Sequence, residues 1–218
     1  MQIAIDGPAG AGKSTVARLI AERLGFIYID TGAMYRALTW KALACEIDLQ
    51  DEEKLYELAR STDIYFAKLA DQQKVICDGI DVSEAIRSPL INAHVSVVAA
   101  QPRVRNVMVK KQQDMACRAN VVMDGRDIGE QVLPEADFKF YITASLDERA
   151  RRRILEMEKQ GFAIDEKSVR QQIEKRDRMD QERELGALKI LDDAIVIDTS
   201  SLSIDEVLNR MLAVIGET

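Results

Sequence analysis

Cysteine, histidine, proline and aromatic side chains are all scarce in this chain of 218 residues. The three cysteines, Cys45, Cys77 and Cys117, are widely spaced and form no CxxC pair. We therefore expect no disulfide framework and no structural zinc site, and a reduced, cytoplasmic compartment. The single histidine, His94, is interpreted as structural. No apolar run approaches the roughly 18 residues that a membrane span needs, and the first residues lack the basic start of a signal peptide, so we expect neither.

Hydrophobic residues make up 47% of the chain, which is close to the globular average and sufficient for a sizeable core. The formal net charge of -7 argues against a surface that coats nucleic acid or an anionic membrane, so we expect no partner of either kind. Positive charge is nevertheless concentrated, because nine of the eighteen arginines lie between Arg126 and Arg183. A local site for an anionic ligand is therefore compatible with an acidic protein.

Short apolar segments with the character of strands alternate with segments of helical periodicity. Five segments are predicted as core strands: 2–6, 26–30, 120–124, 138–143 and 194–198. Such alternation is typical of an α/β fold in which helices cover both faces of a parallel sheet. Three further strands, at 64–68, 74–77 and 80–82, surround the hairpin signal Asp78-Gly79 and predict a small inserted antiparallel sheet.

Several helix ends are marked by capping residues. Thr31 is expected to cap the helix that follows the second strand. The segments 145–148 and 203–206 each have Ser followed three residues later by Glu, which is the pattern of a capping box. The first of these boxes is expected to start a long helix that ends at Gly161.

A glycine-rich segment between the first strand and the first helix matches the pattern GxxxxGK[ST] of phosphate-binding loops. The residues expected to bind ATP are Gly7, Pro8, Ala9, Gly10, Ala11, Gly12, Lys13, Ser14 and Thr15. Glycines let successive backbone N–H groups face phosphate oxygens, and the helix N-terminus adds the positive end of its dipole. Lys13 is expected to reach the β- and γ-phosphates, and the Ser14 hydroxyl to bind Mg²⁺. The loop thus predicts ATP as co-substrate and Mg²⁺ as cofactor.

Three classes of protein use such a loop: small-molecule kinases, GTPases, and motor or nucleic-acid ATPases. A GTPase needs an NKxD-type segment to select its base, and the nearest match, at 174–177, lacks the amide residue. A motor ATPase usually has a strand that ends in adjacent acids, whereas Asp124 is followed by glycine and Arg126. These comparisons favour a kinase. Asp124 is either an acid near the magnesium ion or merely the end of a strand, and the sequence leaves both interpretations open.

Arginines occur where a second phosphate group could bind. Transfer between two polyanions requires cations to neutralise their repulsion, and the guanidinium group binds phosphate through paired hydrogen bonds. The segments 30–36 and 124–127 follow predicted strands, at the edge where open α/β sheets bind ligands. Two helical groups each share one face: Arg176, Asp180 and Arg183, and Arg149 with Arg153. The second group fits a mobile lid that excludes water.

Six motifs occur in one order along the chain. They are GPAGAGKST at 7–15, DTGAMYR at 30–36, G-x-DVS-x-x-IR at 79–87, PRVR at 102–105, DGRDIG at 124–129 and RDRMDQER at 176–183. Together they resemble the bacterial cytidylate kinases, a group of P-loop nucleoside monophosphate kinases, and the resemblance covers essentially the whole chain. It implies an α/β fold with a five-stranded parallel sheet flanked by helices, a small antiparallel β insertion and a helical lid. It also implies ATP-dependent phosphorylation of CMP or dCMP by a monomer.

The resemblance also implies roles for single residues. The residues expected at CMP are Thr31, Tyr35, Arg36, Ser96, Arg105, Arg126, Asp127, Arg176, Asp180 and Arg183. Among these, Arg36 and Arg126 would hold the acceptor phosphate. The catalytic group would consist of Lys13, Arg126, Arg149 and Arg153. The segment 184–191 departs from the family pattern because it lacks a proline.

The implied domains are a core ATP-binding domain of residues 1–36, 88–148 and 184–218, a nucleotide-binding insertion of residues 37–87, and a lid of residues 149–183. Two alternatives remain at this point. One is a kinase for another acceptor, such as UMP or a sugar-like alcohol. The other is a nucleotide-controlled module that binds RNA or protein through the arginines of 149–153, although no stripe of stacking aromatics accompanies them.

Overall fold

The computed structural model describes residues 1–69, 72–159 and 165–216. They form two compact units, one of Met1–Tyr28 with Ala119–Thr218 and the other of Ile29–Arg118. Among the described helices, none combines the length and the apolar character that crossing a membrane requires. The expected end of a helix at Gly161 lies outside the described residues.

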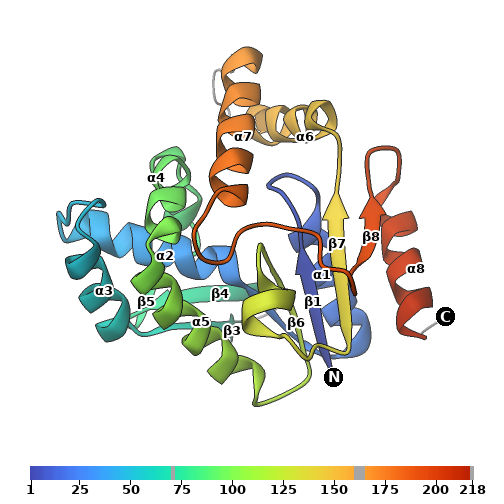
Figure 1. The fold of residues 1–218 in the computed structure, drawn as a ribbon, viewed down its shortest axis with the longest axis horizontal. Coiled ribbons are helices and arrows are strands. Elements are labelled where there is room, and N and C mark those ends of the chain that lie inside the picture. The colour runs from blue at the N-terminus through green and yellow to red at the C-terminus, as the bar shows by residue number, and fades with distance from the viewer. Residues whose placement is uncertain (70–71, 160–164, 217–218) are drawn as a thin grey trace. The chain divides into compact units, whose positions relative to one another are not determined.

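The central sheet has five strands in the order β2-β6-β1-β7-β8 (Figure 1). The strands are β1 (Gln2–Asp6), β2 (Ile27–Asp30), β6 (Val121–Gly125), β7 (Phe138–Thr143) and β8 (Ile195–Asp198). Strand β1 pairs in parallel with β6 on one side and with β7 on the other. The strand order therefore reverses beside β1, which is where open α/β sheets form their ligand sites. The predicted five-stranded parallel sheet with flanking helices is confirmed.

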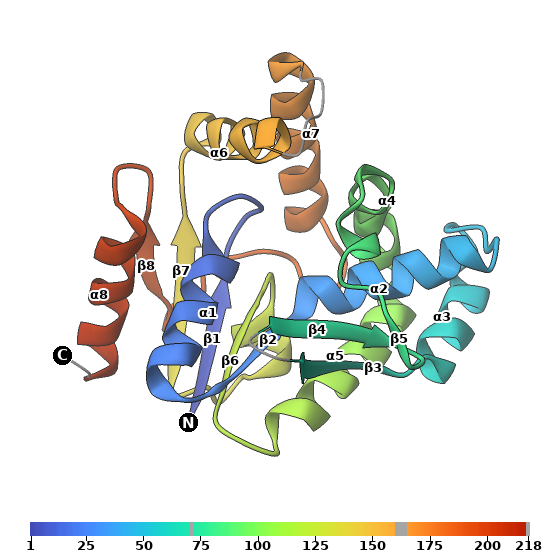
Figure 2. The same ribbon diagram turned by 180° about the vertical axis from the view of Figure 1, so that it is seen from behind.

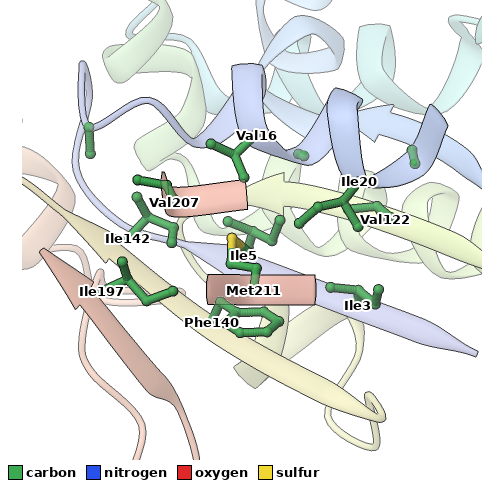
Figure 3. Packing of buried hydrophobic residues seen from close by; sticks show 13 residues of the cluster. Ile3, Ile5, Val16, Ile20, Val122, Phe140, Ile142, Ile197, Val207 and Met211 are labelled. Carbon is green, nitrogen blue, oxygen red and sulfur yellow. The ribbon is translucent and has the colours of Figure 1, made fainter. Parts of the chain in front are cut away.

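The hydrophobic core of the first unit lies between this sheet and the helices α1 (Lys13–Leu24) and α8 (Ile204–Ile215). Figure 3 shows Ile5 and Phe140 of the strands meeting Val16 of α1 and Met211 of α8. Val16 and Ile20 are four residues apart, so both face the sheet. This packing fixes the position of β1, and the glycine-rich loop begins at its carboxyl end.

Two further helices of the first unit, α6 (Leu146–Lys159) and α7 (Glu166–Gln181), lie past the carboxyl end of β7 (Figures 1 and 2). They pack on each other around a small hydrophobic cluster of their own. Its buried members are Ala150, Val169 and Ile173. This cluster is separate from the sheet's core, so the helix pair has its own internal packing.

The second unit combines helices with a three-stranded antiparallel sheet (Figure 2). Its elements are α2 (Thr31–Ala44), α3 (Glu52–Ser61), β3 (Ile64–Leu69), β4 (Gln72–Cys77), β5 (Ile80–Asp81), α4 (Pro89–Ala100) and α5 (Pro102–Ala116). Asp78 and Gly79 both have positive φ, as a two-residue hairpin turn requires. The predicted antiparallel sheet and its turn are confirmed.

The capping predictions are partly wrong. Asp30, not Thr31, caps α2, because its Oδ1 accepts the backbone N–H of Ala33 at 2.8 Å. The box at 203–206 forms in both directions. In the box at 145–148, the Ser145 hydroxyl accepts the backbone N–H of Glu148. The Glu148 carboxylate pairs with Arg151 and Arg152 of α6. Nearby guanidinium groups offer it a stronger, charged partner than a backbone N–H does.

Candidate active site

The phosphate loop leaves β1 at Gly7, whose φ is 144°. A side chain cannot be accommodated here, since an added Cβ would lie 1.9 Å from the carbonyl oxygen of Ile142. Gly12 at the start of α1 has a φ of 94°, a left-handed conformation that glycine adopts without strain. These two glycines explain why the loop can turn tightly at both of its ends.

Lys13 is the first residue of α1 and is only 5% exposed. Its Nζ donates to the carbonyl oxygen of Pro8 at 2.8 Å, across the loop. Burial, assisted by the positive charge of Arg126, lowers the pKa of Lys13 to about 7. Burial therefore disfavours the charged form of Lys13, and a bound anion such as phosphate would stabilise that charged form.

Ser14, the next residue of the helix, is connected to the end of β6. Its Oγ donates to Oδ2 of Asp124 at 2.7 Å, and the hydroxyl of Tyr28 donates to Oδ1 at 2.7 Å. A hydroxyl and a carboxylate are oxygen ligands of the kind that Mg²⁺ takes, usually one or two from protein with substrate phosphates completing the shell. The described residues contain no group of three or more His, Cys, Asp or Glu that could hold a metal ion by themselves. The Ser14 hydroxyl and the Asp124 carboxylate are oxygen donors that suit a divalent cation also bound by substrate phosphates.

Asp6, at the end of β1, fixes the turn that follows β6. Its two carboxylate oxygens accept the backbone N–H groups of Ile128 and Gly129 at 2.8 and 2.9 Å. Burial raises the pKa of Asp6 to about 6. This turn directly follows Arg126 and Asp127. Asp6 therefore fixes the direction of the backbone next to these two residues.

Of the trio predicted on one helical face, Asp180 contacts Arg126, whereas Arg183 lies beyond the end of α7 at Gln181. Nε of Arg126 contacts Oδ2 of Asp180 at 2.6 Å, and Arg183 bonds to Oδ1 of the same carboxylate. Asp180 is 1% exposed, and burial alone would raise its pKa, but the two arginines hold that pKa below its ordinary value. The backbone N–H of Leu188 donates to the Asp180 carbonyl at 2.7 Å, which ties the segment 184–191 to the same end of α7.

The start of α6 contacts the outer side of the phosphate loop. Arg149 donates to the carbonyl oxygen of Ala9 at 3.2 Å and pairs with Asp177 of α7 at 2.7 Å. Arg152 donates to the carbonyl oxygen of Ala11 at 3.3 Å. Arg153, the predicted partner of Arg149, instead pairs with Glu156 of its own helix. The predicted roles of Arg149 and Arg153 in catalysis stay predictions.

The second unit contains its own group of predicted residues on α2, α4 and α5. The Arg36 guanidinium pairs with Asp30 at 2.9 Å. Arg105 is 1% exposed, donates to the carbonyl oxygen of Ala99 at 2.9 Å, and stacks over the Tyr35 ring with 5.4 Å to its centroid. Two further predicted residues, Thr31 and Ser96, are buried. Such a set offers arginine donors and hydroxyl groups held by a packed helical frame.

Sequence reasoning missed four side chains that shape this site: Asp6, Tyr28, Arg152 and Asp177. Asp6 and Tyr28 belong to strands and act on partners more than ninety positions away, and no local pattern marks such contacts. Arg152 was part of a recognisable basic run, but spacing alone did not distinguish it from Arg153. Nδ1 of the single histidine, His94, lies 2.8 Å from the carbonyl oxygen of Leu90 on the same helix, and its structural role stays a prediction.

Comparison with known proteins gives a consistent result. The family model described as "Cytidylate kinase" matches residues 3–217. A relative from Bacillus subtilis (strain 168) named "Cytidylate kinase" is 51% identical over 217 residues, covering 100% of this chain and 97% of its own. Another with that name, from Caldanaerobacter subterraneus subsp. tengcongensis, is 54% identical over 211 residues, covering 97% and 92%.

Among solved structures, a shikimate kinase from Bacteroides thetaiotaomicron aligns with a TM-score of 0.51 at 13% identity, covering 99% of this chain and 98% of that one. At this identity the likeness concerns the fold alone. The sequence relatives are far closer and extend over the full length of the chain. The chain belongs to the cytidylate kinase family.

Proposed function

We propose that this protein transfers the γ-phosphoryl group of ATP to CMP or dCMP, forming ADP and CDP or dCDP. The observation that carries the proposal is that Asp6, directly before the phosphate loop, accepts the backbone N–H groups of Ile128 and Gly129, which holds the turn bearing Arg126 beside that loop. The phosphate loop, which would bind the donor phosphates, and Arg126, which would bind the acceptor phosphate, thus lie next to each other in the first unit. The choice of CMP as acceptor follows from the name of the family's relatives, and the chemistry of the acceptor residues supports it.

On the donor side, the loop of residues 7–15 binds the ATP phosphates. Lys13 leaves the Pro8 carbonyl and pairs with the β- and γ-phosphates, and Thr15 lies near the α-phosphate. The Ser14 hydroxyl, supported by Asp124, holds Mg²⁺, which neutralises phosphate charge when bound. Phosphoryl transfer needs little covalent help, so positioning and charge neutralisation provide the catalysis.

On the acceptor side, Arg36 and Arg126 bind the phosphate of CMP. Arg176 and Asp180 contact the ribose, and Thr31, Ser96, Arg105, Asp127 and Arg183 surround the base, with Tyr35 packed nearby. Cytosine offers an amino donor at N4 and acceptors at N3 and O2. A carboxylate such as Asp127 accepts from N4, whereas uracil presents a carbonyl there and would be repelled.

Residues 149–183 act as a lid that excludes water while the phosphoryl group moves. The separate hydrophobic cluster of α6 and α7 supports this, because a helix pair with its own packing can move as one body. Residues 1–36, 88–148 and 184–218 form the ATP-binding core, and residues 37–87 the CMP-binding insertion. We further propose that the enzyme is a monomer and that it works in the cytoplasm.

The alternative of an arginine strip for RNA or protein receives no support from α6. Arg151 and Arg152 both pair with Glu148, and Arg153 pairs with Glu156. The basic run is therefore largely matched by acids on its own helix.

A coupled assay of ADP release tests the proposal. ATP and Mg²⁺ are offered with CMP, dCMP, UMP, AMP, GMP or no acceptor. We expect rapid turnover with CMP and dCMP, weak turnover with UMP, and loss of all turnover in Lys13→Ala. A rate that does not depend on the acceptor would contradict the proposal.

A further inference from the structure

Tyr28 of β2 connects the hydrophobic core of the first unit to the metal end of the phosphate loop. Its ring packs against the buried cluster of the sheet, which fixes where the phenol oxygen lies. That oxygen donates to Oδ1 of Asp124 at 2.7 Å, and Asp124 is 4% exposed. The carboxylate is thus held by a hydroxyl whose own position is determined by packing.

The opposite oxygen of Asp124 faces Ser14, at the start of α1. Oδ2 accepts the Ser14 hydroxyl proton at 2.7 Å. A serine hydroxyl has one proton to donate and two lone pairs. When the proton is committed to Asp124, the lone pairs of Ser14 are free to point elsewhere, and a cation can use them. The orientation of Ser14 therefore depends on where Asp124 is held.

We propose that Tyr28 is a positioning residue for magnesium: by anchoring one oxygen of Asp124, it keeps the other on Ser14 and so directs the Ser14 lone pairs toward the metal ion that accompanies ATP. This inference rests on the proposed function, in which Ser14 binds Mg²⁺. In this proposal Tyr28 acts through its hydrogen bond to Asp124 and is not itself a ligand of the metal.

The variant Tyr28→Phe tests this inference because it keeps the packed ring and deletes only the hydroxyl. Binding of a non-hydrolysable ATP analogue is measured by isothermal titration calorimetry, once with Mg²⁺ and once with EDTA. We expect the affinity with Mg²⁺ to fall about tenfold, as for loss of a hydrogen bond to a charged group, and the affinity in EDTA to stay unchanged. Tyr65→Phe, which removes the hydroxyl of an exposed tyrosine on β3, is the matched control and should behave as wild type.

A double-mutant cycle shows whether Tyr28 acts through Asp124. In an Asp124→Asn background, Tyr28→Phe should have little further effect on Mg²⁺-dependent binding, because the group it anchors is already altered. Additive effects, an unchanged affinity with Mg²⁺, or an equal loss with and without the metal would each overturn the inference. If the wild-type protein itself bound the analogue equally well in EDTA, the proposed magnesium role would fail instead, so the two failures are distinguishable.

Discussion

Replacing Asp6 by asparagine should change how stability depends on pH. Asp6 is buried and its pKa is raised from 3.8 to about 6, so the folded protein binds this proton more tightly than the unfolded chain does. Stability from this group is therefore full below pH 4 and is lost as the pH rises through 6. The shift corresponds to about 3 kcal/mol across that window.

Asparagine removes this pH dependence and introduces a constant cost. Its amide has one oxygen for the two backbone N–H groups of Ile128 and Gly129, so one donor is left facing an NH₂ group. That mismatch costs about 1–3 kcal/mol at every pH. Asp6→Asn should thus be less stable than wild type at pH 4, and the gap should shrink by about 3 kcal/mol by pH 7.

Urea unfolding followed by far-ultraviolet circular dichroism at pH 4, 5, 6 and 7 measures this difference. Tryptophan fluorescence is unsuitable because the single tryptophan, Trp40, lies on α2 in the other unit. Using the difference between variant and wild type cancels the opposite trends of other carboxylates. A difference that stays flat from pH 4 to pH 7 would refute the reasoning.

Three further predictions concern charges at the site. With a pKa of about 7, Lys13 should take up about half a proton or more when ATP binds at pH 7.5, seen by calorimetry in buffers of different ionisation enthalpy and absent in Lys13→Ala. Asp180→Ala should destabilise the protein by about 3 kcal/mol in urea unfolding, since Arg126 and Arg183 lose their buried counter-charge; equal midpoints would contradict this. Asp127→Asn should raise the ratio of kcat/KM for UMP over CMP at least about tenfold, because the amide can donate to the uracil carbonyl; an unchanged ratio would remove Asp127 from base recognition.

The features predicted correctly from sequence are those written in local patterns. The strand before the glycine-rich segment of residues 7–15 and the helix after it follow from periodicity, and both are confirmed. That this segment binds phosphates is predicted from the fixed spacing of its glycines, Lys13 and Ser14, and stays a prediction. The hairpin at Asp78-Gly79 is equally local, since two residues of positive φ determine the turn. Such features need no knowledge of distant partners.

The features missed depend on tertiary contacts or on competition between neighbours. Asp30 and Thr31 are both good caps, and only the geometry of the strand end decides that Asp30 accepts the N–H. Arg152 and Arg153 are adjacent and chemically alike, yet the helix phase turns Arg152 toward the Ala11 carbonyl. The sequence predicts only that Tyr28 lies in a strand, and gives no sign that its hydroxyl donates to Asp124.

Following the label from γ-phosphate-labelled ATP in the presence of CMP and Mg²⁺ tests the central claim most directly. If the site positions donor and acceptor phosphates and excludes water, the label should appear in CDP, with little in inorganic phosphate. Label that accumulates as inorganic phosphate, at the same rate with and without CMP, would contradict the account.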